Sequence, residues 1–140
     1  MCFLRITSET KSFKGNPALE RLPLYSIHEK GELRRKKTGE LHKNYRVGLD
    51  VSDAEWDDFP QQVEDAIEFL SVRGDALKQL LDSFKDASAC MDFPLWSRLS
   101  DEIVMQSEKL PTKLVALASQ FELSIELSYY QKSSFDELGK

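Results

Sequence analysis

The sequence predicts an α+β protein, in which an antiparallel or mixed sheet of about five or six strands has helices packed on one face. Several short stretches alternate apolar and polar residues, as half-buried strands do. They are interleaved with stretches whose apolar residues recur at helical spacing. Strands with one apolar face and hairpin-like neighbours favour two layers over a sheet covered on both sides. The chain has 140 residues, enough to bury a core, and we expect one domain over residues 1–132 and a polar tail over residues 133–140.

Alternation predicts six strands, over residues 2–7, 24–28, 45–51, 89–95, 103–107 and 123–130. The last of these, LSIELSYY, alternates most regularly, and the fifth is expected to pair back onto the fourth as a hairpin. Pro23 indicates an edge strand, and Pro94 an edge or a bulge, because proline has no N–H to donate to a neighbouring strand. Two glycines and a run of cations within KGELRRKKTGELHKN predict a long, exposed hairpin connection before the third strand.

Three helices and one shorter helical turn are expected between these strands. The Asn-Pro pair at residues 16–17 supplies a cap and a first helical residue for the short one. Asp58 is a natural cap for the first long helix, Gly74 a natural end, and Asp75 a cap for the next. Pro111 can start the last helix. The apolar stripes are Phe59, Val63, Ala66, Ile67 and Leu70, then Leu77, Leu80, Leu81 and Phe84, and finally Leu114, Leu117, Ala118 and Phe121.

Charge is distributed unevenly along the chain, whose formal net charge is −5. Residues 28–46 hold seven Lys or Arg against three Glu, whereas residues 50–68 hold eight acids and no Lys or Arg. An acidic protein is poorly suited to non-specific nucleic-acid binding, which needs a surplus of cations. The acidic segment instead favours a basic protein partner, because complementary fields speed encounter.

Few residues carry the chemistry of an enzyme. A nucleophile commonly needs a histidine base, and the two histidines, His28 and His42, flank the cationic connection with no serine or cysteine motif beside them. Cys2 and Cys90 form no CxxC pair, the acids lack the glycine of a calcium loop, and the six glycines are scattered. The sequence therefore predicts a protein that is not an enzyme and uses no metal or cofactor.

No segment has the character of a membrane anchor. The longest apolar run, LVALA at residues 114–118, is far short of the roughly 20 residues that a spanning helix needs. The first residues lack the basic start and apolar run of a secretory signal. We expect a cytoplasmic protein.

The stretch DVSDAEWDDFPQQVEDAIEFL, from residue 50, is the candidate partner-binding site. Asp57 and Asp58 have a structural alternative, because a helix N-terminus favours acids, and Glu64 fits the polar face of the helix. An exposed Trp56 would favour docking, since aromatic residues ringed by polar groups are typical of binding hot spots; a buried one would favour the structural alternative. The candidate residues are Asp50, Asp53, Glu55, Trp56, Asp57, Asp58 and Glu64.

Four stretches carry a resemblance to a bacterial family. EKLPTKLVALASQFELSIELSYY resembles the end of the domain of unknown function 4279, and FLRITS resembles its opening strand. YRVGLDVSDAEW and VEDAIEFL resemble its middle, a strand ending near a tryptophan and then an apolar-centred helix. The resemblance implies a small α+β fold without known catalytic activity. A chain of this build is also similar to immunity proteins of polymorphic or contact-dependent toxin systems, which bind and block a cognate toxin.

These observations favour an immunity protein whose acidic stretch binds a basic toxin domain, such as a nuclease. The basic residues 34–37 could instead meet an acidic toxin. Two other classes stay open: a domain that binds a small molecule between sheet and helices, and a nucleic-acid-binding domain that uses residues 30–46. Nucleic acid is the weaker of these expectations, because the basic run has no interleaved aromatic residues.

Overall fold

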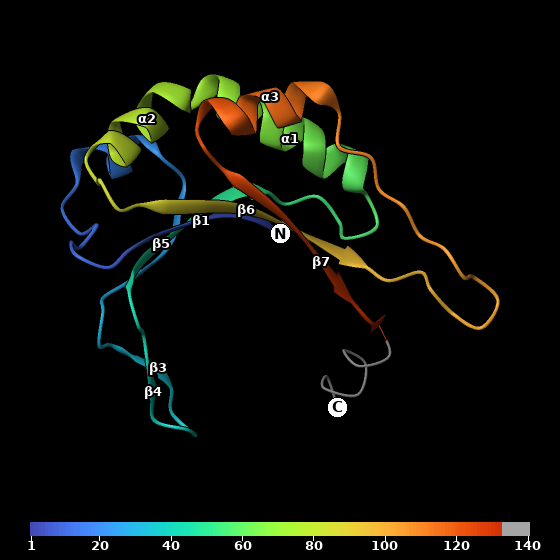
Figure 1. Cartoon of the computed structure of the whole chain (residues 1–140), viewed down its shortest axis with the longest axis horizontal. Helices are drawn as coiled ribbons and strands as arrows, with labels where there is room; N and C mark the ends of the chain where they lie inside the picture. The colour runs from blue at the N-terminus through green and yellow to red at the C-terminus, as the bar shows by residue number, and fades with distance from the viewer. Residues whose placement is uncertain (133–140) are drawn as a thin grey trace.

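The computed structural model describes residues 1–132 and shows an α+β fold with helices on one face of a mixed sheet (Figure 1). Five strands make the main sheet, and a separate two-stranded hairpin hangs below its uncovered face. The fold class expected from the sequence is confirmed. The expected tail, residues 133–140, lies outside the described residues.

The elements follow one another in the order β1 (Cys2–Ser8), η1 (Pro17–Arg21), β2 (Leu24–His28), β3 (Leu33–Arg35), β4 (Glu40–Leu41), β5 (Tyr45–Ser52), α1 (Phe59–Val72), α2 (Gly74–Asp82), β6 (Ser88–Trp96), α3 (Thr112–Gln120) and β7 (Ser124–Tyr130). The strand order in the main sheet is β2-β5-β1-β6-β7. Neighbours pair antiparallel except β6 and β7, which are parallel because α3 carries the chain back across the sheet. That one crossover makes the sheet mixed.

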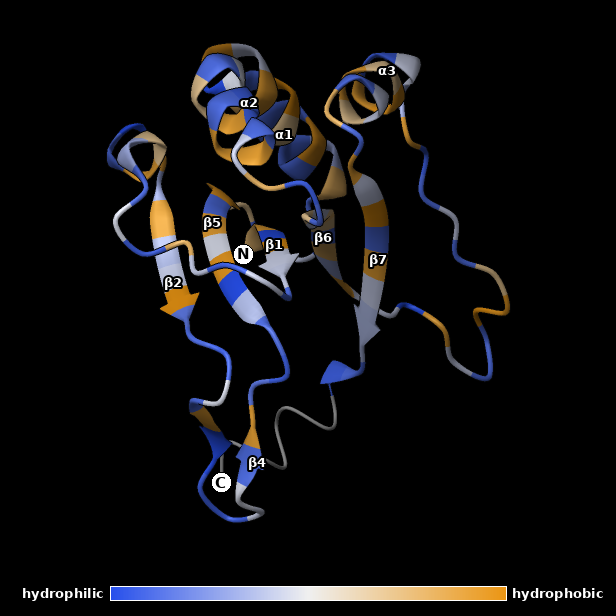
Figure 2. Cartoon of the chain, turned by 60° about the vertical axis from the view of Figure 1, so that its left-hand side comes forward, coloured by the Kyte–Doolittle hydropathy of each residue, from blue (hydrophilic) through white to orange (hydrophobic). Residues whose placement is uncertain are grey.

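Alternation along the strands determines which face is covered. In the central strand β1, residues Cys2, Leu4 and Ile6 are fully buried, while Phe3 and Arg5 between them are partly exposed. Helices α1 and α2 lie over β5 and β1, and α3 lies over β7 (Figure 2). The hydrophobic core lies between the sheet and the helices. It contains Val47, Leu49, Met91, Phe93 and Leu95 from the sheet and Phe59, Val63, Leu70, Leu77, Leu80 and Leu114 from the helices.

Two predicted caps are confirmed. The Asn16 side chain accepts a hydrogen bond from the Ala18 N–H at 3.0 Å, and Asp58 accepts one from the Gln61 N–H at 3.2 Å. The predicted cap at Asp75 is wrong, because α2 already begins at Gly74 and Asp75 lies inside its first turn. Gly74 starts this helix instead of ending α1: it is buried, and a Cβ there would lie 2.9 Å from the Phe121 ring, so the close packing requires glycine.

The edge position predicted from Pro94 is also wrong. Its strand, β6, lies between β1 and β7. Pairing with β1 ends at Asp92, however, so Pro94 has a strand on one side only and its missing N–H breaks no ladder there.

The strand predicted over residues 103–107 is absent, because nothing covers it. Val104 and Met105 are 87% and 75% exposed and lie in an irregular loop that projects beyond the sheet (Figure 1). In residues 1–132, no helix is long and apolar enough to cross a lipid bilayer.

Candidate partner-binding surface

The acidic residues predicted as a site come together at the end of β5 and the start of α1. Asp50 is partly buried on the uncovered face of β5, and the remaining acids lie on the connection to α1 and its first turns. Five of the predicted acids are exposed: Asp53, Glu55, Asp57, Asp58 and Glu64. We refer to these five and Asp50 as the acidic surface.

Only one carboxylate of the acidic surface has a clear structural role. Asp58 caps α1, as described above. Asp65, which lies nearby on α1 outside the acidic surface, also has a structural role. It accepts hydrogen bonds from Ser52 Oγ at 2.5 Å and Gln61 Nε2 at 2.8 Å. Within residues 1–132, none of the ion pairs involves a carboxylate of the acidic surface. Its negative charge is therefore not neutralised by the described Lys and Arg side chains.

Asp50 and Asp53 influence one another directly. Burial raises the pKa of Asp50 above its ordinary value, and the charge of Asp53 together with a hydrogen bond between the two raises it further. The N-terminal ammonium group partly opposes this shift, and a further cation bound at the pair would lower the pKa of Asp50 more.

A small cavity opens beside Asp50, between β5 and α1. Its volume is about 290 Å³, and it is lined by the acidic residues Asp50, Asp65 and Glu68 together with Val51, Phe69, Val72, Pro23 and Arg73. Acidic residues beside an apolar wall suit a lysine or arginine side chain, since its stem is apolar and its head is charged.

Trp56 is half-buried, so its exposure does not decide between a docking residue and a structural one. Its ring lies 4.7 Å from that of Trp96 and 4.8 Å from that of Tyr130, measured between centroids. Lys132 Nζ lies 5.6 Å from the centre of the Trp96 ring. The indole therefore anchors the acidic connection to the ends of β6 and β7, and part of it stays accessible.

The irregular loop after β6 begins beside this aromatic cluster, so it shares an end of the sheet with the acidic surface. Gln106 tethers the loop: its amide donates to the Trp96 carbonyl at 3.1 Å and accepts from the Arg98 N–H at 2.7 Å. The tether leaves Val104 and Met105 exposed at the tip. This exposure could not be predicted from the sequence, because the alternation of residues 103–107 is that of a strand, and only the lack of a neighbouring strand exposes Val104 and Met105.

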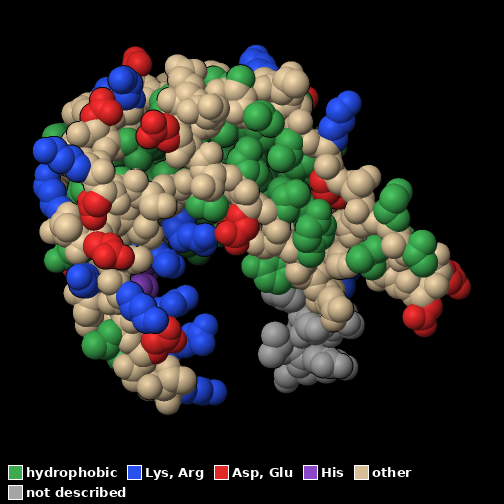
Figure 3. Space-filling view, in the orientation of Figure 1, with side chains coloured by type: hydrophobic (Ala, Val, Ile, Leu, Met, Phe, Trp, Pro, Cys, Tyr) green, Lys and Arg blue, Asp and Glu red, His purple; other side chains and the backbone are tan. Residues whose placement is uncertain are grey.

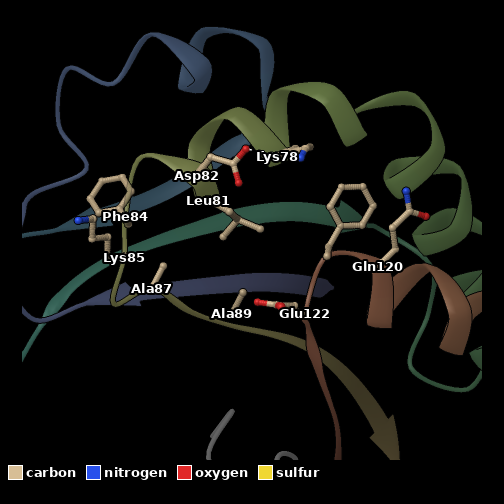
Figure 4. Close-up of a pocket in the computed structure, with 10 residues that line it drawn as sticks. Lys78, Leu81, Asp82, Phe84, Lys85, Ala87, Ala89, Gln120 and Glu122 are labelled. Atoms are coloured by element: carbon tan, nitrogen blue, oxygen red, sulfur yellow. Dashed lines mark ion pairs between the residues drawn. The ribbon is translucent and has the colours of Figure 1, made fainter.

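A larger cavity of about 540 Å³ lies between α2, the start of β6 and the turn after α3 (Figure 4). Leu81 points from α2 toward Ala89 on β6, and Lys78 and Asp82 pair at the rim at 3.6 Å. The other lining residues are Phe84, Lys85, Ala87, Gln120, Phe121 and Glu122. This is the opening between sheet and helices that a small-molecule-binding domain would need.

Most of the basic run of residues 28–46 is exposed, as predicted for a hairpin connection. The β3–β4 hairpin curves beneath the uncovered face of the sheet, so its cations and those of the sheet line one hollow (Figure 3). In the described part of the chain, no three His, Cys, Asp or Glu side chains are arranged to hold a metal ion.

The chain matches no family model, no curated protein and no solved structure. Membership of the domain of unknown function 4279 therefore stays a prediction.

Proposed function

We propose that this protein acts in the cytoplasm as an immunity protein, which binds a cognate bacterial toxin domain and blocks it without catalysing a reaction. The observation that supports this proposal is the acidic surface, whose exposed carboxylates have no cationic partner within residues 1–132. Unpaired charge of one sign favours a partner of the other sign. Toxin domains that cleave nucleic acid carry basic active surfaces, which such a surface would cover.

The acidic connection is held in place before any partner arrives. Asp58 caps α1, Trp56 packs on two aromatic rings, and Gln62 Nε2 donates to the Glu55 carbonyl at 3.1 Å. Residues already ordered in the free protein lose little conformational entropy on binding. The fixed connection thus favours tight binding.

The surroundings of the acidic surface supply the remaining parts of a protein interface. A basic side chain of the toxin would enter the cavity lined by Asp50, Asp65 and Glu68. The exposed Val104 and Met105 would add apolar contact at the same end of the sheet. Interfaces commonly combine a desolvated apolar centre with a charged rim that guides association.

Charge reversal tests this proposal. The toxin domain encoded by the reading frame next to the gene would be titrated with wild-type protein and with Asp53→Lys/Asp57→Lys, by calorimetry. We expect the double variant to bind about tenfold or more weakly and to rescue toxin-expressing cells less well. The matched control, Glu9→Lys/Glu20→Lys, makes the same charge change at exposed positions away from α1 and should keep wild-type affinity.

Two outcomes contradict the proposal in different ways. Equal loss in both double variants would show that net charge matters and that the acidic surface does not make specific contacts. Failure of the wild-type protein to bind or protect against the toxin would overturn the immunity function itself.

The cavity over β6 supports a second candidate function, the binding of a small molecule. Its lining offers a ligand apolar contact from Leu81 and Ala89 and charged groups from Lys78 and Asp82. Leu81→Trp would fill it. A metabolite that raises the melting temperature of the wild-type protein and leaves that of this variant unchanged would favour this function over toxin binding.

A further inference from the structure

The uncovered face of the sheet is a hollow with two differently charged halves. Figure 3 shows Lys and Arg side chains along the hairpin and into the hollow, with carboxylates beside them. The strand register identifies the sheet residues that lie there. Arg5 is paired with Gly48 and Cys90, and Arg46 is paired with Thr7 and His28.

Of the two sheet arginines in this hollow, Arg5 and Arg46, only Arg46 makes no ion pair with residues 1–132. Its Nε is buried and makes no hydrogen bond. The other arginines nearby are compensated: Arg5 lies 3.6 Å from Glu126, and Arg34 lies 3.3 Å from Glu40. A buried guanidinium donor without an acceptor is costly, so Arg46 is left ready to accept an anion.

The electrostatic environment of Arg46 is positive. Burial lowers the pKa of Arg46, and the charges of Arg5 and Arg34 lower it further. The pKa of His42 is lowered in the same environment. Burial lowers it most, and the positive charges of His28, Arg46 and Arg34 lower it further. An anion bound among these groups would reduce the repulsion between their positive charges.

The hollow also holds a second kind of donor, because Gly48 lets the Ser26 hydroxyl come close to β5. Gly48 has no side chain at the centre of the face, and a Cβ there would lie 2.7 Å from Ser26 Oγ. The Ser26 hydroxyl therefore lies directly over β5, on the same face as Arg46. We call the site formed by Arg5, Ser26, His28, Arg46 and Gly48 the Arg46 hollow.

We propose that the Arg46 hollow binds a carboxylate side chain of a partner protein, with Arg46 as its main ligand and Arg5 as a second cation. The planar guanidinium can donate two parallel hydrogen bonds to a carboxylate, which gives such pairs direction as well as strength. The site does not depend on the toxin proposal, although Asp50, on the same face of β5, also belongs to the acidic surface.

Charges at the other side of the hollow favour a protein over a nucleic acid. Asp50 lies on the same face of β5 as Arg46, and Asp92 and Glu126 lie on the same face of β6 and β7. A phosphate chain long enough to cross the hollow would meet these carboxylates and be repelled. A folded protein can present an acid to Arg46 and a base to Asp92, so its charges can match both halves.

Peptide binding tests the site. A fluorescent eight-residue peptide with glutamates at one end and lysines at the other is titrated with the full chain at low salt, and its anisotropy is measured. We expect Arg46→Gln to weaken binding about tenfold and Arg46→Lys less, because lysine keeps the charge but not the paired geometry. The matched control is Arg35→Gln, which removes an equal charge from the exposed hairpin and should change affinity by less than about twofold.

Two further measurements make the test decisive. The side-chain Nε–H resonance of Arg46 should shift during the titration, whereas that of Arg35 should not. Arg46→Gln should melt at the same temperature as wild type or higher, since it removes a buried donor that has no acceptor; a purely structural role would predict a lower one.

Three results would overturn the proposal. Equal weakening by Arg46→Gln and Arg35→Gln would show diffuse attraction to the hairpin. Tighter, Arg46-dependent binding of an eight-nucleotide single strand would identify a nucleic-acid site instead. Absence of peptide binding by the wild-type protein would show that the hollow does not accept a carboxylate.

Discussion

The Gln62 side chain of α1 donates a hydrogen bond to the Pro94 carbonyl of β6 at 3.0 Å, and the same nitrogen donates to the Glu55 carbonyl at 3.1 Å. Gln62 is fully buried. Its amide lies where the pairing of β6 with β1 has ended, at Asp92, and so it replaces a strand as the partner of the Pro94 carbonyl. The Gln62 side chain thereby links α1, β6 and the connection between β5 and α1 by hydrogen bonds.

Gln62→Leu should lower the free energy of unfolding by about 1–3 kcal/mol, because the buried Pro94 carbonyl and the partly buried Glu55 carbonyl lose their donor. The loss is partly offset, since the Gln62 Oε1 is itself buried without a partner and disappears with the amide. Urea unfolding would measure the change. Gln61→Leu is the control: Gln61 is exposed on the same helix, and its loss should cost less than about 0.5 kcal/mol. Equal effects of the two variants would contradict the role assigned to Gln62.

Gly48→Ala should destabilise the protein by about 1 kcal/mol, because the new methyl group meets Ser26 Oγ. Ser26→Ala removes that oxygen and should restore stability in the double variant, since alanine also suits a strand interior better than glycine. A double-mutant cycle by thermal unfolding should therefore give a coupling energy near 1 kcal/mol. Simple additivity of the two substitutions would show that the contact is not the cause.

Asp86 should make stability depend on pH in the acid range. Hydrogen bonds from the Glu9 N–H at 2.8 Å and from Ser8 Oγ at 2.9 Å hold the pKa of Asp86 below its ordinary value, the backbone N–H contributing most. A carboxylate with a lowered pKa stabilises the fold above its unfolded pKa of about 4, and this contribution is lost as the pH falls through the lower folded value. Between about pH 5 and pH 3 the melting temperature of wild type should fall more steeply than that of Asp86→Asn.

The control for this pH dependence is Asp101→Asn, at an exposed position of the loop after β6. Its melting temperature should follow that of the wild type across the same pH range. Parallel curves for wild type and Asp86→Asn would rule out a contribution from the hydrogen bonds to Asp86.

The two cysteines should react at very different rates with a thiol reagent. Cys2 is fully buried and burial raises its pKa far above the ordinary range, so we expect it to react only when the protein unfolds. Cys90 is partly exposed, its pKa is raised by burial and by the Glu126 charge, and its Sγ lies 3.9 Å from Glu126 Oε2. Glu126→Gln should therefore speed its labelling at about pH 8, because the thiolate is the reactive form.

Absorbance of the released reagent would count the thiols. One fast-reacting thiol is expected in the native protein and none in Cys90→Ala. Two thiols reacting at one rate would contradict the buried position of Cys2.

Local patterns in the sequence determined much of the framework. The alternation of β1 and the caps at Asn16 and Asp58 could be predicted, because a cap bonds within three residues and a strand face repeats every second residue. The excess of acids between residues 50 and 68 was also visible without coordinates. The fold class and the position of the acidic surface follow from such local signals.

Contacts between distant residues were decided by the tertiary structure. Sequence alone could not show that β7 runs parallel to β6, that Pro94 lies in an inner strand, or that residues 103–107 find no partner. Nor could it show that Arg5 and Arg46 line one hollow. Both alternate correctly on their own strands, but which strands become neighbours, and in which register, depends on the packing of the whole chain.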